Sequence, residues 1–371
     1  MAAHLRGTEA HVLLSAIQSN LRQFQHAVGS EVDIMAVVKA NGYGHGALPV
    51  AKACLEAGAA WLGVAVAEEA IELRDSGIEE PILILGASNA EQVELALKYN
   101  LDLTIFDQRA FEMAMAVGKR WDKKPRVHVK IDTGMGRVGI SPETVLSEWV
   151  PRLMQKGVIW QGLMSHLADS DGIEEDYTRQ QLRRFLDVIE SIRASGTPLP
   201  PKLHLANSAA TLRYPGTHFN MVRIGIGLYG AMFYPGAPPL HPALTLTSRV
   251  TYVKKVPPGF SVGYGRTFVT SEESGLATVA IGYADGYRRA LSNRAEVLIG
   301  GVRCPVVGRV SMDQITCRVP NGHSVEVGDA VTLIGTQGHE TLGIEEIAGW
   351  AETISYEILT GISSRVPRRY R

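Results

Sequence analysis

The feature that most constrains the fold is a regular alternation of short apolar runs and helical patterns from the start of the chain to about residue 230. Most of the intervening segments have 3.6-residue periodicity and an acidic first turn, which are typical of amphipathic helices. Eight strand–helix units in this length predict a (β/α)8 TIM barrel, whereas the alternative, a doubly wound open sheet, usually has five or six strands. The eight apolar runs span residues 34–40, 61–66, 81–86, 101–106, 126–132, 160–167, 202–208 and 221–227.

The sequence changes character after FYPGAPPLHP at 233–242, where short β-rich runs begin. Gly, Pro, Asn and Asp punctuate these runs at close spacing, and only one helical pattern is evident, IEEIAGWAE at 344–352. We therefore expect an α/β chain with an N-terminal TIM barrel over residues 1–235 and a mostly-β C-terminal domain over residues 236–371. The β-rich runs include 244–256, 276–283, 295–310 and 329–335.

Composition and charge exclude several classes of protein. With 45% hydrophobic and 20% charged residues the chain is an ordinary globular protein, and its formal net charge of -1 provides no global field for nucleic acid or anionic membrane. The start, MAAHLRGTEA, lacks the apolar run of a signal peptide, and no apolar stretch reaches the ~18 residues of a membrane span. The three cysteines form no CxxC pair, which argues against a zinc site and fits a reducing cytoplasm.

Polar and reactive side chains gather at the C-terminal ends of five of these runs, where a TIM barrel carries its active site. One of them alone, such as Lys39 in AVVKANGYGHG, could cap its strand and extend to water. Five strands that end in this way indicate an active-site face. The residues are Lys39, then Lys130 and Asp132, then Ser165 and His166, then His204, Asn207 and Ser208, and finally Arg223 with Gly225, Ile226 and Gly227.

The loops after the seventh and eighth runs are where this fold usually holds a phosphate. Here they offer the Ser208 hydroxyl and the backbone N–H groups of Gly225 and Ile226, which suit a phosphate dianion. A lysine on the same face, Lys39, could form a Schiff base with a phosphorylated aldehyde. Together these groups suggest pyridoxal 5'-phosphate (PLP) as the cofactor.

Two other motifs suggest different chemistry and are less well supported. The segment 134–139 matches the dinucleotide-binding pattern G-x-G-x-x-G, but it follows the fifth strand, and MQKGVIWQG at 154–162 lacks the acidic residue that this reading requires. A hydrolase metal cluster is the second alternative, but the first run carries no HxH pair, so we expect no metal and favour a supporting polar role. The residues of that cluster would be His166, Asp169, Asp171 and His204.

A series of motifs runs along almost the entire chain: AVVKANGYGHG, KIDTGMGRVG, the SH of LMSHLADSD, HLANSAA, VRIGIGLYG, VGYGRTF, IGYADGYRR, GRVSMDQ and ISYEILTGISSRVPRRY. In these motifs and in their order, the chain resembles the bacterial alanine racemase family. That family combines a TIM barrel with a β domain and uses PLP, in agreement with the division reached from the patterns.

The resemblance implies a two-base mechanism, in which Lys39 binds PLP as a Schiff base and acts as one base. Tyr264 would be the other, and would reach into the barrel of the partner subunit in a homodimer with composite sites. Arg223 would hydrogen-bond the pyridine nitrogen, Arg137 would contact the phenolic oxygen of PLP and the substrate carboxylate, and the Met312 N–H would bind that carboxylate.

Further residues are implied around this centre. The PLP phosphate would be held by Tyr43, Ser208, Gly225, Ile226 and Tyr356. Supporting roles would fall to His166 and Asn207 near the cofactor, to Asp313, and to Lys130, which matches a position often carbamylated in the family and would steady Arg137. Tyr283 and Arg289 would line the entry corridor.

Arg223 distinguishes a racemase from other PLP enzymes that have this type of barrel. An arginine cannot realistically give up its proton, so the ring nitrogen would stay unprotonated, which limits protonation at the wrong carbon and hence transamination. PLP decarboxylases with a similar barrel use an acidic residue there, so VRIGIG at 222–227 favours a racemase.

The chain departs from the family pattern at three places without losing a catalytic group. The stretch 4–24 lacks the usual Trp-Ala-Glu-Ile-Asp lead-in, Ser311 stands where many members have cysteine, and Gly263 stands where many have serine. The implied function is interconversion of L-alanine and D-alanine, which supplies D-alanine for peptidoglycan. The alternatives are a racemase of serine or of basic amino acids and a non-catalytic PLP carrier. The large side chains of Tyr283 and Tyr356 favour a small substrate, and the β domain argues against a carrier.

Overall fold

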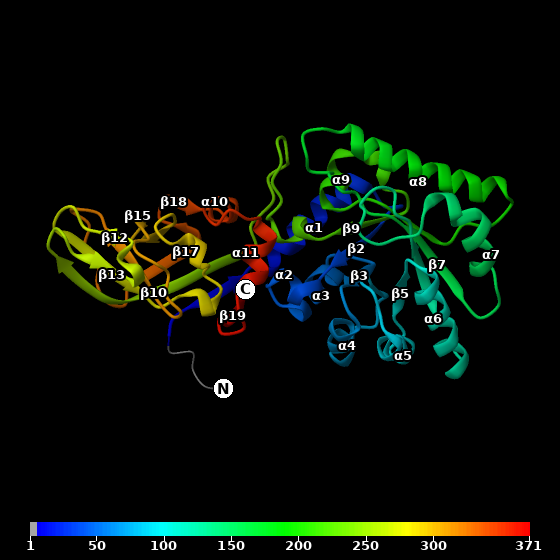
Figure 1. Ribbon diagram of the computed structural model, residues 1–371, viewed down its shortest axis with the longest axis horizontal. Coiled ribbons are helices and arrows are strands. Elements are labelled where there is room, and N and C mark those ends of the chain that lie inside the picture. Colours follow the sequence, from blue (N-terminus) through cyan, green and yellow to red (C-terminus); the bar gives the residue numbers. More distant parts are fainter. Residues whose placement is uncertain (1–5) are drawn as a thin grey trace. The chain divides into compact units, whose positions relative to one another are not determined.

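The computed structural model describes residues 6–371, which form two compact units (Figure 1). The barrel unit consists of Ile17–Gly42 and Ala47–Leu240. The β unit consists of the described residues up to Ala16, of Tyr43–Gly46 and of His241–Arg371. This division differs from the expected one at the N-terminus, because the first strand joins the sheet of the β unit.

The barrel unit contains eight parallel strands in the order β8-β7-β6-β5-β4-β3-β2-β9, and each of the eight predicted runs is confirmed as a strand. Between the first and last strands of this order, the backbone N–H of Arg223 donates to the carbonyl of Ala206 at 3.0 Å, so the barrel is nearly closed. The strands are β2 (Asp33–Val37), β3 (Trp61–Val64), β4 (Ile82–Ile84), β5 (Asp102–Ile105), β6 (Arg126–Lys130), β7 (Ile159–Met164), β8 (Lys202–His204) and β9 (Met221–Ile224).

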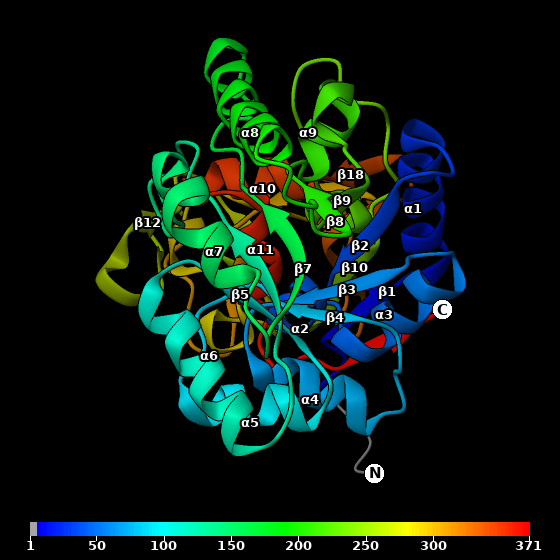
Figure 2. The same ribbon diagram turned by 90° about the vertical axis from the view of Figure 1, so that its right-hand side faces the viewer.

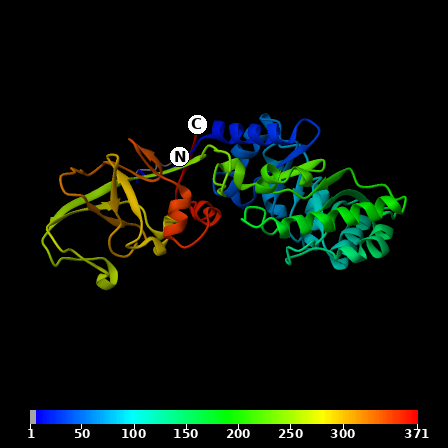
Figure 3. The same cartoon turned by 90° about the horizontal axis from the view of Figure 1, so that it is seen from above.

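Amphipathic helices surround these strands, as Figure 2 shows, and several begin at residues whose side chains cap them. At the start of α5 the Asn89 side chain accepts the N–H of Gln92, and the Asn89 N–H donates to the Gln92 side chain; Asp107 caps α6. The long α8 lies on the outside of this unit (Figure 3). The helices of the barrel region are α1 (Leu14–Val28), α2 (Lys39–Tyr43), α3 (Ala47–Glu56), α4 (Ala67–Asp75), α5 (Ala90–Lys98), α6 (Gln108–Arg120), α7 (Val150–Leu153), α8 (Asp176–Ala194) and α9 (Ser208–Arg213).

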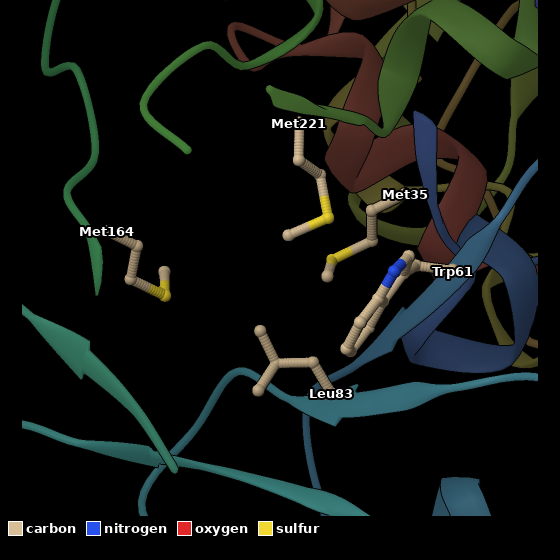
Figure 4. Close-up of a cluster of buried hydrophobic side chains, with 5 residues drawn as sticks. All are labelled: Met35, Trp61, Leu83, Met164 and Met221. Atoms are coloured by element: carbon tan, nitrogen blue, oxygen red, sulfur yellow. The ribbon is translucent and has the colours of Figure 1, made fainter. Parts of the chain in front are cut away.

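A cluster of buried apolar side chains fills the space enclosed by the strands (Figure 4). Met35, Trp61, Leu83, Met164 and Met221 come from five different strands and point toward one another. Burial of each such side chain contributes about 1.5–3 kcal/mol to the stability of the fold. The barrel therefore encloses a packed core, and a ligand site is expected at the loops that follow the strands.

The β unit is built on a sheet in which β15, β14, β17, β10, β1 and β19 are successive neighbours, and β13 and β16 extend it from β10. Strand β1 pairs antiparallel with β10 and parallel with β19, which explains why the N-terminal segment belongs here. The strands are β1 (Glu9–Val12), β10 (Leu244–Val256), β11 (Ser261–Val262), β12 (Phe268–Val269), β13 (Ser274–Val279), β14 (Glu296–Ile299), β15 (Val302–Pro305), β16 (Ile315–Val319), β17 (Ala330–Gln337), β18 (Glu340–Leu342) and β19 (Arg368–Tyr370).

The expectation of a single helix in this unit is wrong, because α11 (Ser355–Gly361) follows the predicted α10 (Ile344–Trp350). The sequence of α11, SYEILTG, is too short and too rich in β-branched and aromatic residues to indicate a helix by propensity. Burial of Ile358 and Leu359 stabilises it instead. Over the described part of the chain, no helix has the length and apolarity that crossing a membrane would require.

Candidate active site

Lys39 lies at the carboxyl end of β2, where it begins the short helix α2. The segment that follows Lys39 forms a single left-handed turn, in which the N–H of Gly42 donates to the carbonyl of Val38 at 2.8 Å. Only one of the residues with left-handed backbone is glycine, so the turn is strained and depends on its surroundings. The left-handed φ angles are 52° at Ala40, 53° at Asn41, 60° at Gly42 and 50° at Tyr43.

Side chains from the barrel unit hold this turn in place. One carboxylate oxygen of Glu69 accepts the N–H of Ala40 at 2.6 Å, and the other accepts the N–H of Ala65 at 2.7 Å. Asn41 accepts the N–H of Ala47 at 2.9 Å. The backbone around Lys39 is thus tied both to the end of β3 and to the start of α3.

The charges around Lys39 affect its amine. Burial lowers the pKa of Lys39, and the guanidinium of Arg137 lowers it further, whereas the carboxylate of Glu69 raises it and Arg223 again lowers it. Because the depressing effects are larger, the neutral amine is more accessible here than in water.

Arg223 is buried at the carboxyl half of β9, and burial lowers its pKa to about 10, so it stays a cation at neutral pH. One terminal nitrogen donates to the carbonyl of His204 at 3.0 Å, and the other to the carbonyls of Ser165 at 2.8 Å and Leu205 at 3.1 Å. Ring nitrogens of His204 and His166 lie 3.0 Å and 3.2 Å from the same two atoms. Within residues 6–371, Nε of Arg223 donates to no group, so one N–H remains for a ligand.

Behind Arg223, two histidines form a buried hydrogen-bonded chain inside the barrel. Because Arg223 can only donate, Nδ1 of His204 accepts, so His204 Nε2–H donates to Nδ1 of His128 over 2.9 Å. The Nε2–H of His128 then faces Asp102, 3.8 Å away, which in turn pairs with Arg126 at 3.0 Å. Burial lowers the pKa of His128 to about 3, and lowers that of His204 well below the ordinary value.

The loops expected to hold a phosphate come together around Ser208. Its hydroxyl oxygen accepts the N–H groups of Gly225 at 2.9 Å and Gly227 at 3.3 Å, and Asn207 caps α9 by accepting the N–H of Ala210 at 3.0 Å. Ile226 begins a short 3-10 turn (Ile226–Tyr229), so its N–H has no acceptor within that turn. The N–H of Gly225, expected to bind the phosphate, is thus engaged by Ser208, and the Ser208 hydroxyl proton and the Ile226 N–H remain as donors. A hydroxyl and an N–H donor without a carboxylate between them suit a dianion, so they fit the phosphate of PLP.

Arg137 is carried by the loop that follows β6, and Asp132 organises this loop. Its carboxylate accepts the N–H of Gly134 at 2.9 Å and that of Gly136 at 3.0 Å. No helix begins within 134–139, so this glycine pattern lacks the geometry of a dinucleotide site. Lys130 donates to the carbonyl of Val138, and burial, together with nearby arginines, lowers its pKa to about 8.

The other histidine of the alternative metal cluster, His166, also lies beside the arginines. His166 lies against Arg223, and burial together with four cations lowers its pKa well below the ordinary value. In residues 6–371 no three His, Cys, Asp or Glu side chains are grouped as metal ligands. The four cations that act on His166, and that the barrel unit therefore brings together, are Arg223, Arg137, Lys130 and Lys39.

In the β unit, several expected residues lie on neighbouring loops. Tyr264, 72% exposed, follows Gly263, where a Cβ atom would approach the N of Arg309 to 3.2 Å. The N–H of Tyr283 donates to the carbonyl of Ser311 at 3.0 Å, and that of Ala284 to Met312 at 3.0 Å. Tyr264, Tyr283 and Met312 are thus exposed on loops joined through the segment 308–313.

Three other predicted residues of this unit have different surroundings. Asp313 pairs with Arg365 at 2.9 Å. Arg289 is exposed at the start of a short 3-10 turn. The ring of Tyr356 lies 6.0 Å from that of Tyr43, and burial raises the pKa of Tyr43, so the latter hydroxyl stays protonated.

Three residues of the barrel network were missed from the sequence. His128 and Asp102 lie within apolar strands, and a polar residue at an inward strand position was the available signal. Glu69 is one of two acidic residues in the first turn of α4, and no local sequence pattern indicates that its side chain reaches Ala40.

Comparison with known proteins identifies two domain families in succession. The alanine racemase N-terminal domain matches residues 12–233, and the alanine racemase C-terminal domain matches residues 243–370. The alanine racemase of Symbiobacterium thermophilum is 47% identical, over 99% of this chain and 97% of that protein. The alanine racemase of Geobacillus stearothermophilus is 43% identical, over 98% of this chain and 93% of its own length.

Solved structures give the same answer. The crystal structure of alanine racemase from Bacillus anthracis with bound L-Ala-P has a TM-score of 0.92 at 41% identity, and the match covers 99% of this chain and 95% of that one. Alanine racemase from Streptomyces coelicolor has a TM-score of 0.94 at 34% identity, covering 100% and 99%. Similarity of this extent covers both units.

Proposed function

The chain belongs to the alanine racemase family, and we propose that Lys39 and Tyr264 are the two bases with which it interconverts L-alanine and D-alanine. The reaction is an isomerisation and the cofactor is PLP. Bound PLP delocalises the electron pair that remains when the α-proton of alanine is removed. What the chain itself must provide is a base on each side of the α-carbon and control over where protons return.

Lys39 would serve the face from which D-alanine loses its proton. A lysine removes a proton only as the neutral amine, and burial with Arg137 nearby lowers its pKa in that direction. The left-handed turn positions its amine at the barrel end that also carries Arg223 and Ser208. PLP would accordingly be held by the Lys39 amine, the free N–H of Arg223, and the donors around Ser208.

Tyr264 would serve the opposite face, from which L-alanine loses its proton. Its side chain is 72% exposed in the β unit, so it is available to a site outside its own unit. The N–H of Met312, on a loop connected to the same region, would bind the substrate carboxylate. We propose that Tyr264 enters the barrel of a partner subunit, so that a homodimer has two composite sites.

Arg223 is the single observation that favours racemisation most. It is buried, stays cationic, and is held by three carbonyl oxygens and two histidines, which leaves Nε–H as the group that faces a ligand. A fixed cationic donor cannot protonate the cofactor ring, and therefore limits return of the proton to the wrong carbon. We also propose that four further residues contact the cofactor: Tyr43, His166, Asn207 and Tyr356.

Lys130 would steady Arg137 after addition of carbon dioxide. With its pKa lowered to about 8, roughly a tenth of its amine is neutral at pH 7, and only this form attacks carbon dioxide. The neutral nitrogen bonds to the carbon of carbon dioxide while one C=O π bond opens to a carboxylate oxygen. The ammonium proton lost beforehand and the second proton lost from nitrogen both go to solvent, so a cation becomes an anion beside the arginine. We also propose that the enzyme is cytoplasmic and that its D-alanine serves peptidoglycan synthesis. Tyr283 and Arg289 would line the entry corridor, and Asp313 would have a supporting role.

The function is tested by changing Lys39 to alanine and leaving the rest of the site intact. Lys39→Ala should lose the near-visible, borohydride-sensitive absorption band of lysine-bound PLP and nearly all racemisation of alanine, whereas Lys52→Ala, at an exposed lysine, should keep both. Parallel assays with alanine, serine and lysine distinguish substrate classes. An unchanged spectrum in Lys39→Ala would refute the assignment, and faster racemisation of serine or lysine would correct the substrate.

A further inference from the structure

Glu69 occupies an unusual position for a residue in the first turn of a surface helix. It is the third residue of α4, and one carboxylate oxygen accepts the N–H of Ala65, just before that helix. This contact resembles the ordinary capping arrangement at a helix start. The other oxygen accepts the N–H of Ala40, 29 positions away in sequence and directly after Lys39. Helix capping accounts for the first bond but not for the second.

The second bond falls where the chain most needs support. Ala40, Asn41 and Tyr43 have left-handed backbone conformations, which residues with a Cβ atom adopt at an energetic cost. The N–H of Ala40 is the first backbone donor after the side chain of Lys39. Anything that fixes this N–H also fixes the direction in which Lys39 leaves the end of β2.

The charge of Glu69 acts on the same lysine. Around Lys39 the barrel unit places Arg137 and Arg223, which lower its pKa, and Glu69, which raises it. Loss of the carboxylate would therefore leave two cations unopposed, and the amine would titrate at lower pH. The geometric and the electrostatic effect have the same target.

We propose that Glu69 is a positioning residue for the reaction, whose two oxygens clamp the left-handed turn to the end of β3 and so hold the amine of Lys39 at one face of the substrate. This inference rests on the proposed function of Lys39 as a base. It predicts an effect confined to one face of the α-carbon, since Tyr264 is carried by a different unit.

The matched variants are Glu69→Gln and Glu68→Gln, which remove the same charge from adjacent positions of the first turn of α4. The exposed Glu68 accepts from the side chain of Gln92 at 3.0 Å and 3.1 Å, and does not contact the turn. A glutamine at position 69 replaces one of the two accepting oxygens by an NH2 group, which only donates, so the two N–H groups no longer each meet an oxygen. Both variants keep Lys39 and the groups proposed to hold PLP.

The main measurement is the exchange of the α-proton with deuterated solvent in the alanine that has not inverted, starting from each enantiomer separately. In Glu69→Gln, exchange from D-alanine should fall about tenfold or more relative to exchange from L-alanine, because a displaced base reacts more slowly. Its dependence on pH should also move to lower pH. Glu68→Gln should match the wild type in both respects.

Two readouts do not depend on activity. Hydrogen–deuterium exchange of a peptide covering residues 36–46 should accelerate in the cofactor-free Glu69→Gln protein but not in Glu68→Gln. The near-visible band of bound PLP should remain in both.

If Glu69→Gln does not fold, Glu69→Asp is measured in the same way. Aspartate keeps the charge but is too short to make both bonds, so exchange from D-alanine should still fall, without the shift of its pH dependence.

The possible failures are distinct. If Lys39→Ala still exchanges the α-proton of D-alanine, the proposed function of Lys39 is wrong. If Lys39→Ala is inactive but the Glu69 variant behaves like Glu68→Gln, or loses exchange equally from both enantiomers, the clamp is refuted while the function stands.

Discussion

At the scale of single residues, the chemistry depends on what surrounds each titratable group. Burial and Arg137 lower the pKa of Lys39 and so keep more of its amine neutral, and Glu69 opposes this effect, whereas Arg223 keeps its proton although it is buried. Tyr264 differs from both because its side chain is exposed in its own unit. The role that we propose for Tyr264 as a base would therefore depend on its surroundings in the proposed composite site.

Replacing Tyr264 by phenylalanine removes the hydroxyl and leaves the ring. Tyr264→Phe should still bind PLP, but exchange of the α-proton with deuterated solvent should fall more for L-alanine than for D-alanine, because each base serves one face. Exchange is measured in the uninverted substrate by mass spectrometry. Tyr252→Phe, an exposed tyrosine of β10, is the control that should change nothing. Equal losses for the two enantiomers would contradict a two-base mechanism.

At the scale of elements, the segment Tyr43–Gly46 shows how glycine permits a close approach of backbone to backbone. Gly44 has a φ of 82°, and a Cβ atom there would lie 2.2 Å from the carbonyl oxygen of Leu359 in α11. Both residues belong to the β unit. Packing of this segment on α11 also brings Tyr43 next to Tyr356, so a local backbone requirement affects two proposed phosphate ligands.

Gly44→Ala should destabilise the protein by about 2 kcal/mol or more, through the left-handed conformation and the collision with Leu359. Gly259→Ala is a matched control in the same unit, since Gly259 has a φ of 80° and nothing within 4 Å of its added Cβ atom. Its cost should be only about 1 kcal/mol. Urea unfolding curves provide the comparison, and equal midpoints for the two variants would show that the contact with α11 does not matter.

At the scale of the whole molecule, the barrel buries ionisable groups beside its apolar core. The ring of His128 lies 5.4 Å from that of Trp61, a member of the apolar cluster inside the barrel. His128 is hydrogen-bonded to His204, which in turn accepts from Arg223. These histidines stay neutral because burial disfavours their charged form. The barrel interior therefore holds Arg223 through histidines that must stay neutral.

This arrangement makes stability depend on pH in a defined direction. His128 has a pKa of about 3 in the folded protein and about 6.5 when unfolded, so between these values the unfolded chain binds a proton that the folded protein does not. Stability is complete above about pH 6.5 and should fall by up to about 1.4 kcal/mol per pH unit for each such histidine as the pH decreases. Unfolding midpoints in urea between pH 7.5 and 5 measure this slope.

The slope can be assigned with a pair of variants. His128→Gln should reduce it, and His26→Gln, at an exposed histidine of α1, should leave it unchanged. If the slope persists in His128→Gln, the neutral state of the buried chain does not control the acid sensitivity.

The assembly that we propose can be tested by mixing inactive proteins. If each site takes Lys39 from one protomer and Tyr264 from the other, a mixed dimer of Lys39→Ala and Tyr264→Ala has one intact site and one doubly substituted site. Random pairing makes about half of the dimers mixed, so activity should rise from near zero toward about a quarter of the wild-type value. No recovery, although mixed dimers are shown to form by mass spectrometry, would place both bases in one chain.

The sequence by itself determined the barrel, since eight apolar runs and the periodic segments between them are local patterns that each strand and helix needs in order to bury one face. It also placed Lys39, Ser208 and Arg223 together, because the carboxyl ends of parallel strands share one face of a barrel. Only the tertiary structure decided that β1 pairs with β10 and β19 and that α11 is helical. It also decided that AVVKANGYGHG contains a left-handed turn, that Glu69 binds this turn, and that His128 is linked through His204 to Arg223. These features depend on partners that are distant in sequence, 29 positions apart for Glu69 and Ala40 and 76 for His128 and His204, and no local periodicity encodes such a pairing.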